Sequence, residues 1–98
     1  MIRSFRDKWL EDFYLHDRRH RKIPADTEDR LFRKLQILDD AVNQRDLCSP
    51  PGNHFETLHG RLAGKYSIRV NIRWRLIFGW DDSGGHAENV YLDDHSYR

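Results

Sequence analysis

The chain has only one cysteine, Cys48, and no long apolar run. A single cysteine cannot form a disulfide within the chain and excludes a cysteine-rich zinc site, which favours a reducing compartment. His16 and His20 have the spacing of a helical metal pair, but no third ligand stands beside them, so no metal site is expected. No segment approaches the roughly 20 apolar residues of a membrane helix, and residues 1–5 lack the apolar stretch of a signal peptide. These absences predict a cytoplasmic protein without membrane contact.

Net charge is also nearly absent, because 17 Lys and Arg oppose 16 Asp and Glu in 98 residues. So weak an overall field attracts a polyanion only if the charges are segregated along the chain. The length predicts a single domain over residues 1–98, since so short a chain buries only about 60–65% of its unfolded surface. Three Trp, four Tyr and five Phe argue against a disordered chain.

The N-terminal half has mainly helical periodicity. Residues 2–5 alternate apolar and polar, as in a short strand, and Asp7 can then cap a short helix. From about residue 26 to residue 42 apolar residues recur at the 3.6-residue period of a helix. These apolar positions are Leu31, Phe32, Leu35, Leu38, Ala41 and Val42. Prolines and a glycine in residues 48–53 predict an irregular turn that ends this half.

The C-terminal half changes to a period of two. Every even position from 66 to 80 is apolar or aromatic, whereas odd positions 67–75 are polar, which is typical of a half-buried sheet. This run exceeds one typical strand, so we expect a hairpin that turns near residues 71–73. An odd-numbered loop, of three or five residues, keeps the apolar set on one face. A turn at residues 82–85 then leads to a last strand over about 87–92, and residues 54–58 are a shorter strand candidate.

The expected fold is therefore α+β. An antiparallel sheet of three to five strands would carry two N-terminal helices on one face. The other face would stay wet.

Positive charge gathers in the predicted hairpin. Residues 60–75 contain five cations and no acid, whereas residues 81–98 contain five acids and one arginine. The cations are Arg61, Lys65, Arg69, Arg73 and Arg75. The arginines share the parity of the wet face, where they could contact several phosphates. The alternative is a solvated surface whose cations pair with the acidic strand beside it.

Several motifs of this sequence resemble the HigB toxins of the RelE superfamily. The proline turn at residues 49–53, the Ser-Ile-Arg strand at 67–69, the Trp74-Arg75 pair and the near-terminal His95 follow one another in the family's order. The resemblance covers most of residues 49–95 and residues 1–5. It implies the same fold, in the order strand, two helices and three strands. It also implies a toxin that enters the ribosomal A site and cleaves messenger RNA there.

The resemblance implies a partner as well. Toxins of this family are held in check by a HigA-like antitoxin with a helix-turn-helix domain. Operator DNA would be reached only indirectly, through that antitoxin.

The reaction that the resemblance implies uses neither a metal nor another cofactor. The ribose 2′-hydroxyl attacks the adjacent phosphate, which requires a base, an acid and a cation that stabilises the growing charge. Arg75 matches the family's arginine and is the expected cation. His95 is assigned general acid or base, because the unperturbed pKa of histidine, about 6.5, suits proton transfer near neutral pH. Asp93 would orient that imidazole or take part in proton transfer, and Glu56 is a candidate general base.

The remaining candidates would contact the RNA backbone. They are Arg61, Lys65, Arg69, Arg73 and His59. Asp94 departs from the family, which usually has tyrosine there, and so places an acid beside the scissile phosphate and removes a ring that could stack on a base. Tyr97 could supply that ring. Two alternatives stay open: a catalytically weak RNA- or ribosome-binding module, and an interaction protein that acts only with its antitoxin in operon repression.

Overall fold

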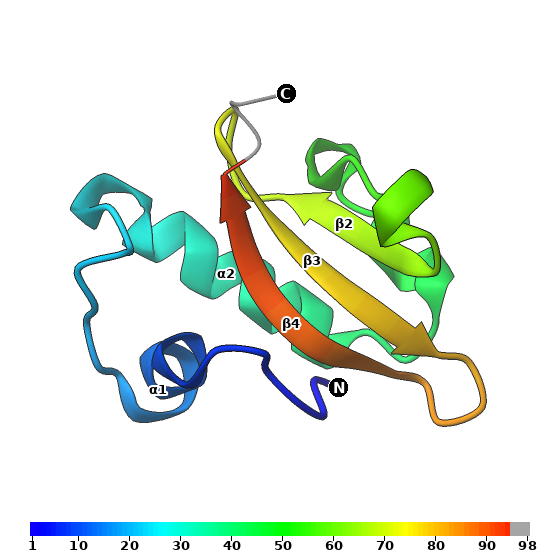
Figure 1. Ribbon diagram of the computed structural model, residues 1–98, viewed down its shortest axis with the longest axis horizontal. Coiled ribbons are helices and arrows are strands. Elements are labelled where there is room, and N and C mark those ends of the chain that lie inside the picture. Colours follow the sequence, from blue (N-terminus) through cyan, green and yellow to red (C-terminus); the bar gives the residue numbers. More distant parts are fainter. Residues whose placement is uncertain (95–98) are drawn as a thin grey trace.

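A curved antiparallel sheet lies against two helices in the computed structural model, which describes residues 1–94 (Figure 1). The elements are α1 (Lys8–His16), α2 (Glu28–Asp40), β1 (Glu56–Thr57), β2 (Lys65–Arg69), β3 (Trp74–Asp81) and β4 (His86–Asp94). Neighbouring strands are hydrogen-bonded in sequence order, each antiparallel to the next. Both helices contribute buried leucines or phenylalanine to the core against one face of this sheet, as the sequence predicts. Within residues 1–94, no helix is long and apolar enough to cross a membrane.

The helices differ from the predicted ones at their ends. Asp7 takes the N-cap position of α1, but its carboxylate accepts from the Arg6 guanidinium at 2.8 Å instead of capping the helix. α2 ends at Asp40, because Ala41 adopts an extended conformation. The prediction that the helical period continues to Val42 was therefore wrong, and Val42 is 68% exposed. Phe32 is also partly exposed, at 38%, where it packs on the rings of Phe13 and Tyr14.

The β2–β3 hairpin confirms the predicted odd-numbered loop, which has three residues. Ile68 pairs with Leu76 and Arg69 with Arg75, so even positions stay opposite even positions. The Val70 N–H donates to the Trp74 carbonyl at 2.9 Å and closes the loop over residues 71–73. The even apolar side chains of the two strands consequently face the helices, whereas Ile72 in the loop is 86% exposed, contrary to the alternating pattern.

Other strand predictions need adjustment. β4 begins and ends slightly beyond residues 87–92, whereas β1 keeps only two residues of 54–58. Residues 2–5 form no strand of their own and make two isolated parallel bridges, Ile2 with Ala87 and Phe5 with Val90.

The face of the sheet away from α1 and α2, here termed the open face, is drier than expected. Ile77 is fully buried there, and Tyr91 is 8% exposed. They pack with Leu58 and Leu62, which precede β2 in the chain. The expectation of a fully wet face was wrong, because the chain between β1 and β2 folds over part of it.

Asp39 near the end of α2 joins three segments of the chain. One carboxylate oxygen accepts from the Ile2 N–H at 2.8 Å, and the other accepts from the Tyr14 hydroxyl at 2.8 Å. The α-amino group of Met1 also donates to the Ala41 carbonyl at 2.7 Å. Burial, followed by the hydrogen bond to Asp39, raises the pKa of Tyr14. The N-terminal segment and α1 are thus tied to α2.

Asp39→Ala is expected to lower the free energy of unfolding by about 1–3 kcal/mol, because it leaves two donors without their acceptor. Asp40→Ala, the same change at the exposed neighbouring position, should cost about 0.5 kcal/mol or less. Urea denaturation followed by circular dichroism measures both. Equal losses in the two variants would contradict the role given to Asp39.

The Tyr14 hydroxyl should make stability depend on pH. Its pKa is raised on folding, so the stability from this group is complete below the unfolded value, about 10, and falls as the pH rises. Tyr14→Phe should cost about 1 kcal/mol at neutral pH, and this difference from wild type should shrink by about 1 kcal/mol at pH 11. Urea denaturation at a series of pH values tests this, and a constant difference would refute it.

Candidate nucleic-acid interface

Strand register aligns several predicted site residues on the open face. Arg69 of β2, Arg75 of β3 and Asp93 of β4 are direct cross-strand neighbours in one row. The next row contains Glu56, Ser67, Ile77 and Tyr91. Side chains opposite one another on one face lie within contact range. The fold therefore brings together three of the predicted catalytic and binding residues and puts Glu56 in the adjacent row.

Arg75 lies on the predicted face, but its expected exposure was wrong. The residue is only 4% exposed, and its Nε donates to Asp93 Oδ2 at 3.1 Å. Its Nη2 is buried and has no hydrogen-bond partner within residues 1–94. A guanidinium stays charged at any working pH, and an unpaired buried donor is costly. The site thus contains a fixed cation with an unused donor.

Acidic residues of β4 pair with two of the five cations of residues 60–75. This agrees with the alternative interpretation, in which these cations pair with the neighbouring acidic strand. Asp93 pairs with Arg75, and Asp94 pairs with Arg73 at 3.1 Å. The Arg73 guanidinium also lies 5.5 Å from the centre of the Trp74 ring. Trp74 and Asp94 are register partners on the side of the sheet that faces the helices. Placing Arg73 on the open face was therefore wrong, because strand alternation stops in the 71–73 loop.

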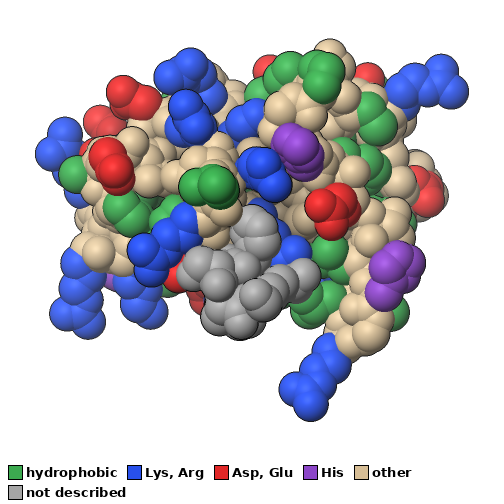
Figure 2. All heavy atoms as spheres, turned by 90° about the horizontal axis from the view of Figure 1, so that it is seen from above, with side chains coloured by type: hydrophobic (Ala, Val, Ile, Leu, Met, Phe, Trp, Pro, Cys, Tyr) green, Lys and Arg blue, Asp and Glu red, His purple; other side chains and the backbone are tan. Residues whose placement is uncertain are grey.

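The other predicted RNA contacts are spread around the sheet. Arg61 and His59 are exposed in the turn that precedes β2. Lys65 and Arg69 are half-buried at opposite ends of β2, about 13 Å apart along the strand. Figure 2 looks onto the end of the sheet where β4 stops and shows Lys and Arg side chains on several sides of it.

The proton-transfer candidates are only partly placed. Glu56 is exposed on β1, opposite Ser67. His95 and Tyr97 lie outside the described residues, so their roles stay predictions. Asp93 contacts Arg75, and its proposed contact with an imidazole is likewise a prediction.

Arg6 is a neighbour of this site that the sequence did not reveal. Its guanidinium lies 3.8 Å from the centre of the Tyr91 ring. The hydrogen bond to Asp7 is the main cause that raises the pKa of Arg6, and the charge of Asp93 contributes. The parallel bridge between Phe5 and Val90 brings Arg6 to β4, where its N–H donates to the Val90 carbonyl at 3.0 Å, and no local pattern predicts such a long-range pairing.

A second group of polar side chains lies at the other end of the open face. Asp81, His86 and Glu88 offer ligand atoms within 4.8 Å of one another, and they are the one such metal-ligating group in the described part of the chain. The spacing along β3 places them about 20 Å from Arg75. They are therefore separate from the arginine row.

Comparisons with solved structures agree with the fold. A chain of a YoeB-YefM complex from Staphylococcus aureus superposes with a TM-score of 0.59 at 20% identity, covering 97% of this chain and 98% of that chain. A chain of a heterotetrameric YoeB-YefM toxin-antitoxin complex, also from S. aureus, gives a TM-score of 0.59 at 18% identity, covering 99% of both chains. These similarities support the RelE-type α+β fold.

Sequence comparisons identify the family. The model of HigB-like toxins, described as RelE-like toxins of type II toxin-antitoxin systems, matches residues 3–95. Toxin HigB-1 of Vibrio cholerae is 58% identical over 97 residues, which cover 99% of this chain and 100% of the relative. An uncharacterized protein of Haemophilus influenzae is 43% identical over 94 residues, covering 96% of this chain and 91% of the relative. The chain belongs to the HigB-like family of RelE-like toxins.

Proposed function

We propose that this chain is a ribosome-dependent endoribonuclease that cleaves messenger RNA in the A site without a metal. The ribose 2′-hydroxyl would attack the adjacent phosphate, and translation would stop. The observation that carries this proposal is the buried guanidinium of Arg75, which has an unused donor on the open face beside Arg69.

Arg75 would stabilise the charge that grows on the phosphate oxygens. Its Nε is already fixed by Asp93, so little reorganisation is needed when the charge develops. Its Nη2 has no hydrogen-bond partner in residues 1–94, and an anionic oxygen that reached it when the covering side chains moved would supply the missing acceptor. Because the site is largely removed from water, the attraction is stronger than at an exposed arginine.

His95 and Glu56 would transfer the protons. The main role of Asp93 would be to position Arg75. Glu56 lies two strands from Arg75, about 10 Å across the sheet, so a bound nucleotide would bridge the two side chains. His95 retains its assignment as general acid or base from the sequence resemblance.

The surrounding cations would hold the RNA backbone. Arg69 lies beside Arg75, and the other contacts would come from His59, Arg61, Lys65 and, at the end of the sheet, Arg73. The proposed partners are the ribosome with its messenger RNA and a HigA-like antitoxin, through which operator DNA would be bound. We place this activity in the bacterial cytoplasm.

Arg75→Lys should slow cleavage strongly while keeping the charge, because lysine lacks the fixed fork of donors. We expect a loss of about 100- to 1,000-fold in the single-turnover rate on messenger RNA in programmed ribosomes. Arg33→Lys is the matched control, because Arg33 is exposed on α2, away from the open face. Circular dichroism verifies that both variants fold.

Growth of induced bacteria separates this proposal from its alternatives. Arrest with message cleavage in wild type, and neither in Arg75→Lys, supports the nuclease. Arrest without cleavage in wild type would instead indicate a binding module. No arrest would indicate a protein that acts only in complex with its antitoxin.

The backbone contacts should appear in the salt dependence of binding. Arg61→Ala is expected to reduce the slope of log affinity against log salt concentration by about 0.7–1, the effect of one lost phosphate contact. Binding is measured on ribosomes programmed with messenger RNA that carries a 2′-deoxyribose at the cleavage site, which prevents attack. Arg33→Ala makes the same change in charge away from the open face, and an equal slope change there would rule out a local contact.

A further inference from the structure

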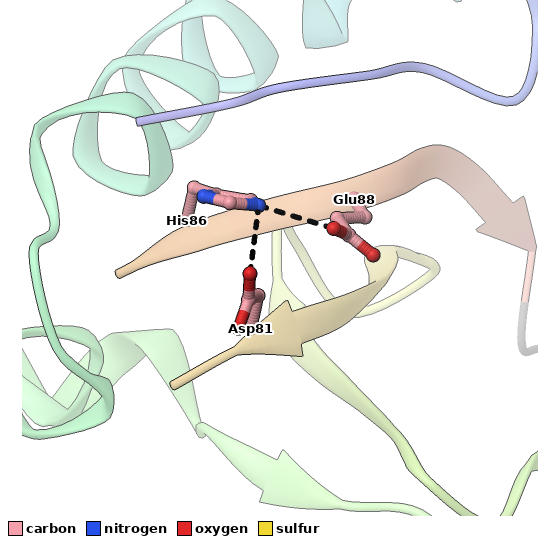
Figure 3. A group of neighbouring side chains, drawn as sticks. All are labelled: Asp81, His86 and Glu88. Carbon is pink, nitrogen blue, oxygen red and sulfur yellow. Dashed lines mark hydrogen bonds and ion pairs between the residues drawn. The ribbon is translucent and has the colours of Figure 1, made fainter. Parts of the chain in front are cut away.

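We propose that Asp81, His86 and Glu88 form a binding site for one divalent transition metal ion of the Zn²⁺ type. The three side chains flank the β3–β4 turn and converge in Figure 3. Nε2 of His86 lies 3.0 Å from Glu88 Oε1 and 3.4 Å from Asp81 Oδ2. A single ring nitrogen thus faces two carboxylates, although its one hydrogen can make a well-directed bond to only one of them.

The separations suit a metal of this size. Zn²⁺ holds nitrogen and oxygen ligands at about 2.0–2.2 Å, which places neighbouring ligands of a tetrahedral site about 3.3–3.6 Å apart. The two His86 distances lie close to this range, and the three ligand atoms are all within 4.8 Å of one another. A small movement of the carboxylates would complete three ligands and leave the fourth position for water.

The strands and the turn orient these ligands in advance. Asp81 and His86 are register partners, and His86 is only 6% exposed. The other oxygen of Asp81, Oδ1, accepts from the Ser83 N–H at 3.0 Å and the Ser83 hydroxyl at 2.8 Å. The hydrogen bond from the Ser83 hydroxyl, followed by one from the Gly84 N–H, lowers the pKa of Asp81. Oδ2 remains directed toward His86, as an outer-shell partner would arrange it.

Gly84 has no side chain, which leaves space beside the His86 imidazole. A Cβ there would lie 2.6 Å from His86 Nδ1 and 3.0 Å from Asp81 Oδ2. Any side chain would therefore push on two of the three ligands. The turn sequence fits a site in which their positions must be preserved.

Arg3 is the cation that the metal would displace. Its Nη1 lies 3.4 Å from His86 Nε2, the ring nitrogen that would bind the ion. Arg3 is exposed on the segment beside β4, so its side chain can move into water at little cost.

The ligand set favours a particular class of metal. One imidazole and two carboxylates suit Zn²⁺ and related first-row ions, whereas Mg²⁺ and Ca²⁺ prefer oxygen ligands alone. Because the group lies about 20 Å from Arg75, the ion would stabilise the β3–β4 hairpin and take no part in RNA cleavage. This inference is independent of the proposed nuclease activity.

Isothermal titration of the chelator-treated full chain with Zn²⁺ tests the site. We expect one ion per chain and a rise of several degrees in Tm at saturating Zn²⁺, with neither effect from Mg²⁺. Glu88→Gln should weaken Zn²⁺ binding by at least about tenfold, and Ser83→Ala by about tenfold through the orientation of Asp81. Glu88 is only half-buried, so its variant should fold.

Asp82→Asn is the matched control. It removes an exposed carboxylate from the same turn, which accepts from Gln44 and is not one of the three ligands. Its affinity for Zn²⁺ should equal that of wild type. Absence of a one-to-one isotherm would overturn the proposal. Equal binding by wild type and Glu88→Gln would overturn it too, because the ion would then lie elsewhere.

Discussion

The pairing of β3 with β4 is the interaction on which the other features of this molecule depend. It places Arg75 opposite Asp93 and Asp81 opposite His86. A slip of one residue would move each of these side chains to the other face of the sheet. The register is not uniform: it shifts between Ile77 and Gly79, close to Asn89, whose φ of 53° is left-handed. This irregularity lets β4 present even-numbered residues on the open face before Asn89 and odd-numbered residues after it.

The two ends of the open face consequently differ in the sign of their charged side chains. One contains the arginine row, and the other contains the carboxylates around His86. The near-zero net charge of the chain conceals this separation. At the first end Asp93 neutralises part of the charge of Arg75 and fixes the orientation of its guanidinium. A cation can therefore be buried in this site. A polyanion would be attracted to this end, which is the physical basis of the proposed RNA binding.

The sequence predicted what depends on local periodicity. Alternation from Tyr66 to Trp80 was enough for the hairpin, its odd-numbered loop and the face on which Arg75 lies. The pattern failed where a regular element ends, as at Arg73 and Val42. It could not reveal contacts made by distant segments, such as Arg6 with Tyr91, nor the grouping of Asp81 with His86 and Glu88, which depends on the irregular register of β4. The burial of Arg75 was missed because it results from packing over the sheet. His95 lies beyond residue 94, and its role stays a prediction.

The N-terminal segment also determines how other chains can approach this sheet. Main-chain hydrogen bonds from residues 1–6 occupy the outer side of β4 at Ala87 and Val90, while β1 at the opposite border is only two residues long. Unprotected strand borders invite edge-to-edge association between molecules. The segment therefore covers the β4 edge and disfavours edge-to-edge association of two molecules there. A partner arriving beside Ala87 or Val90 meets a backbone whose donors and acceptors are already used, so recognition there must rely on side chains.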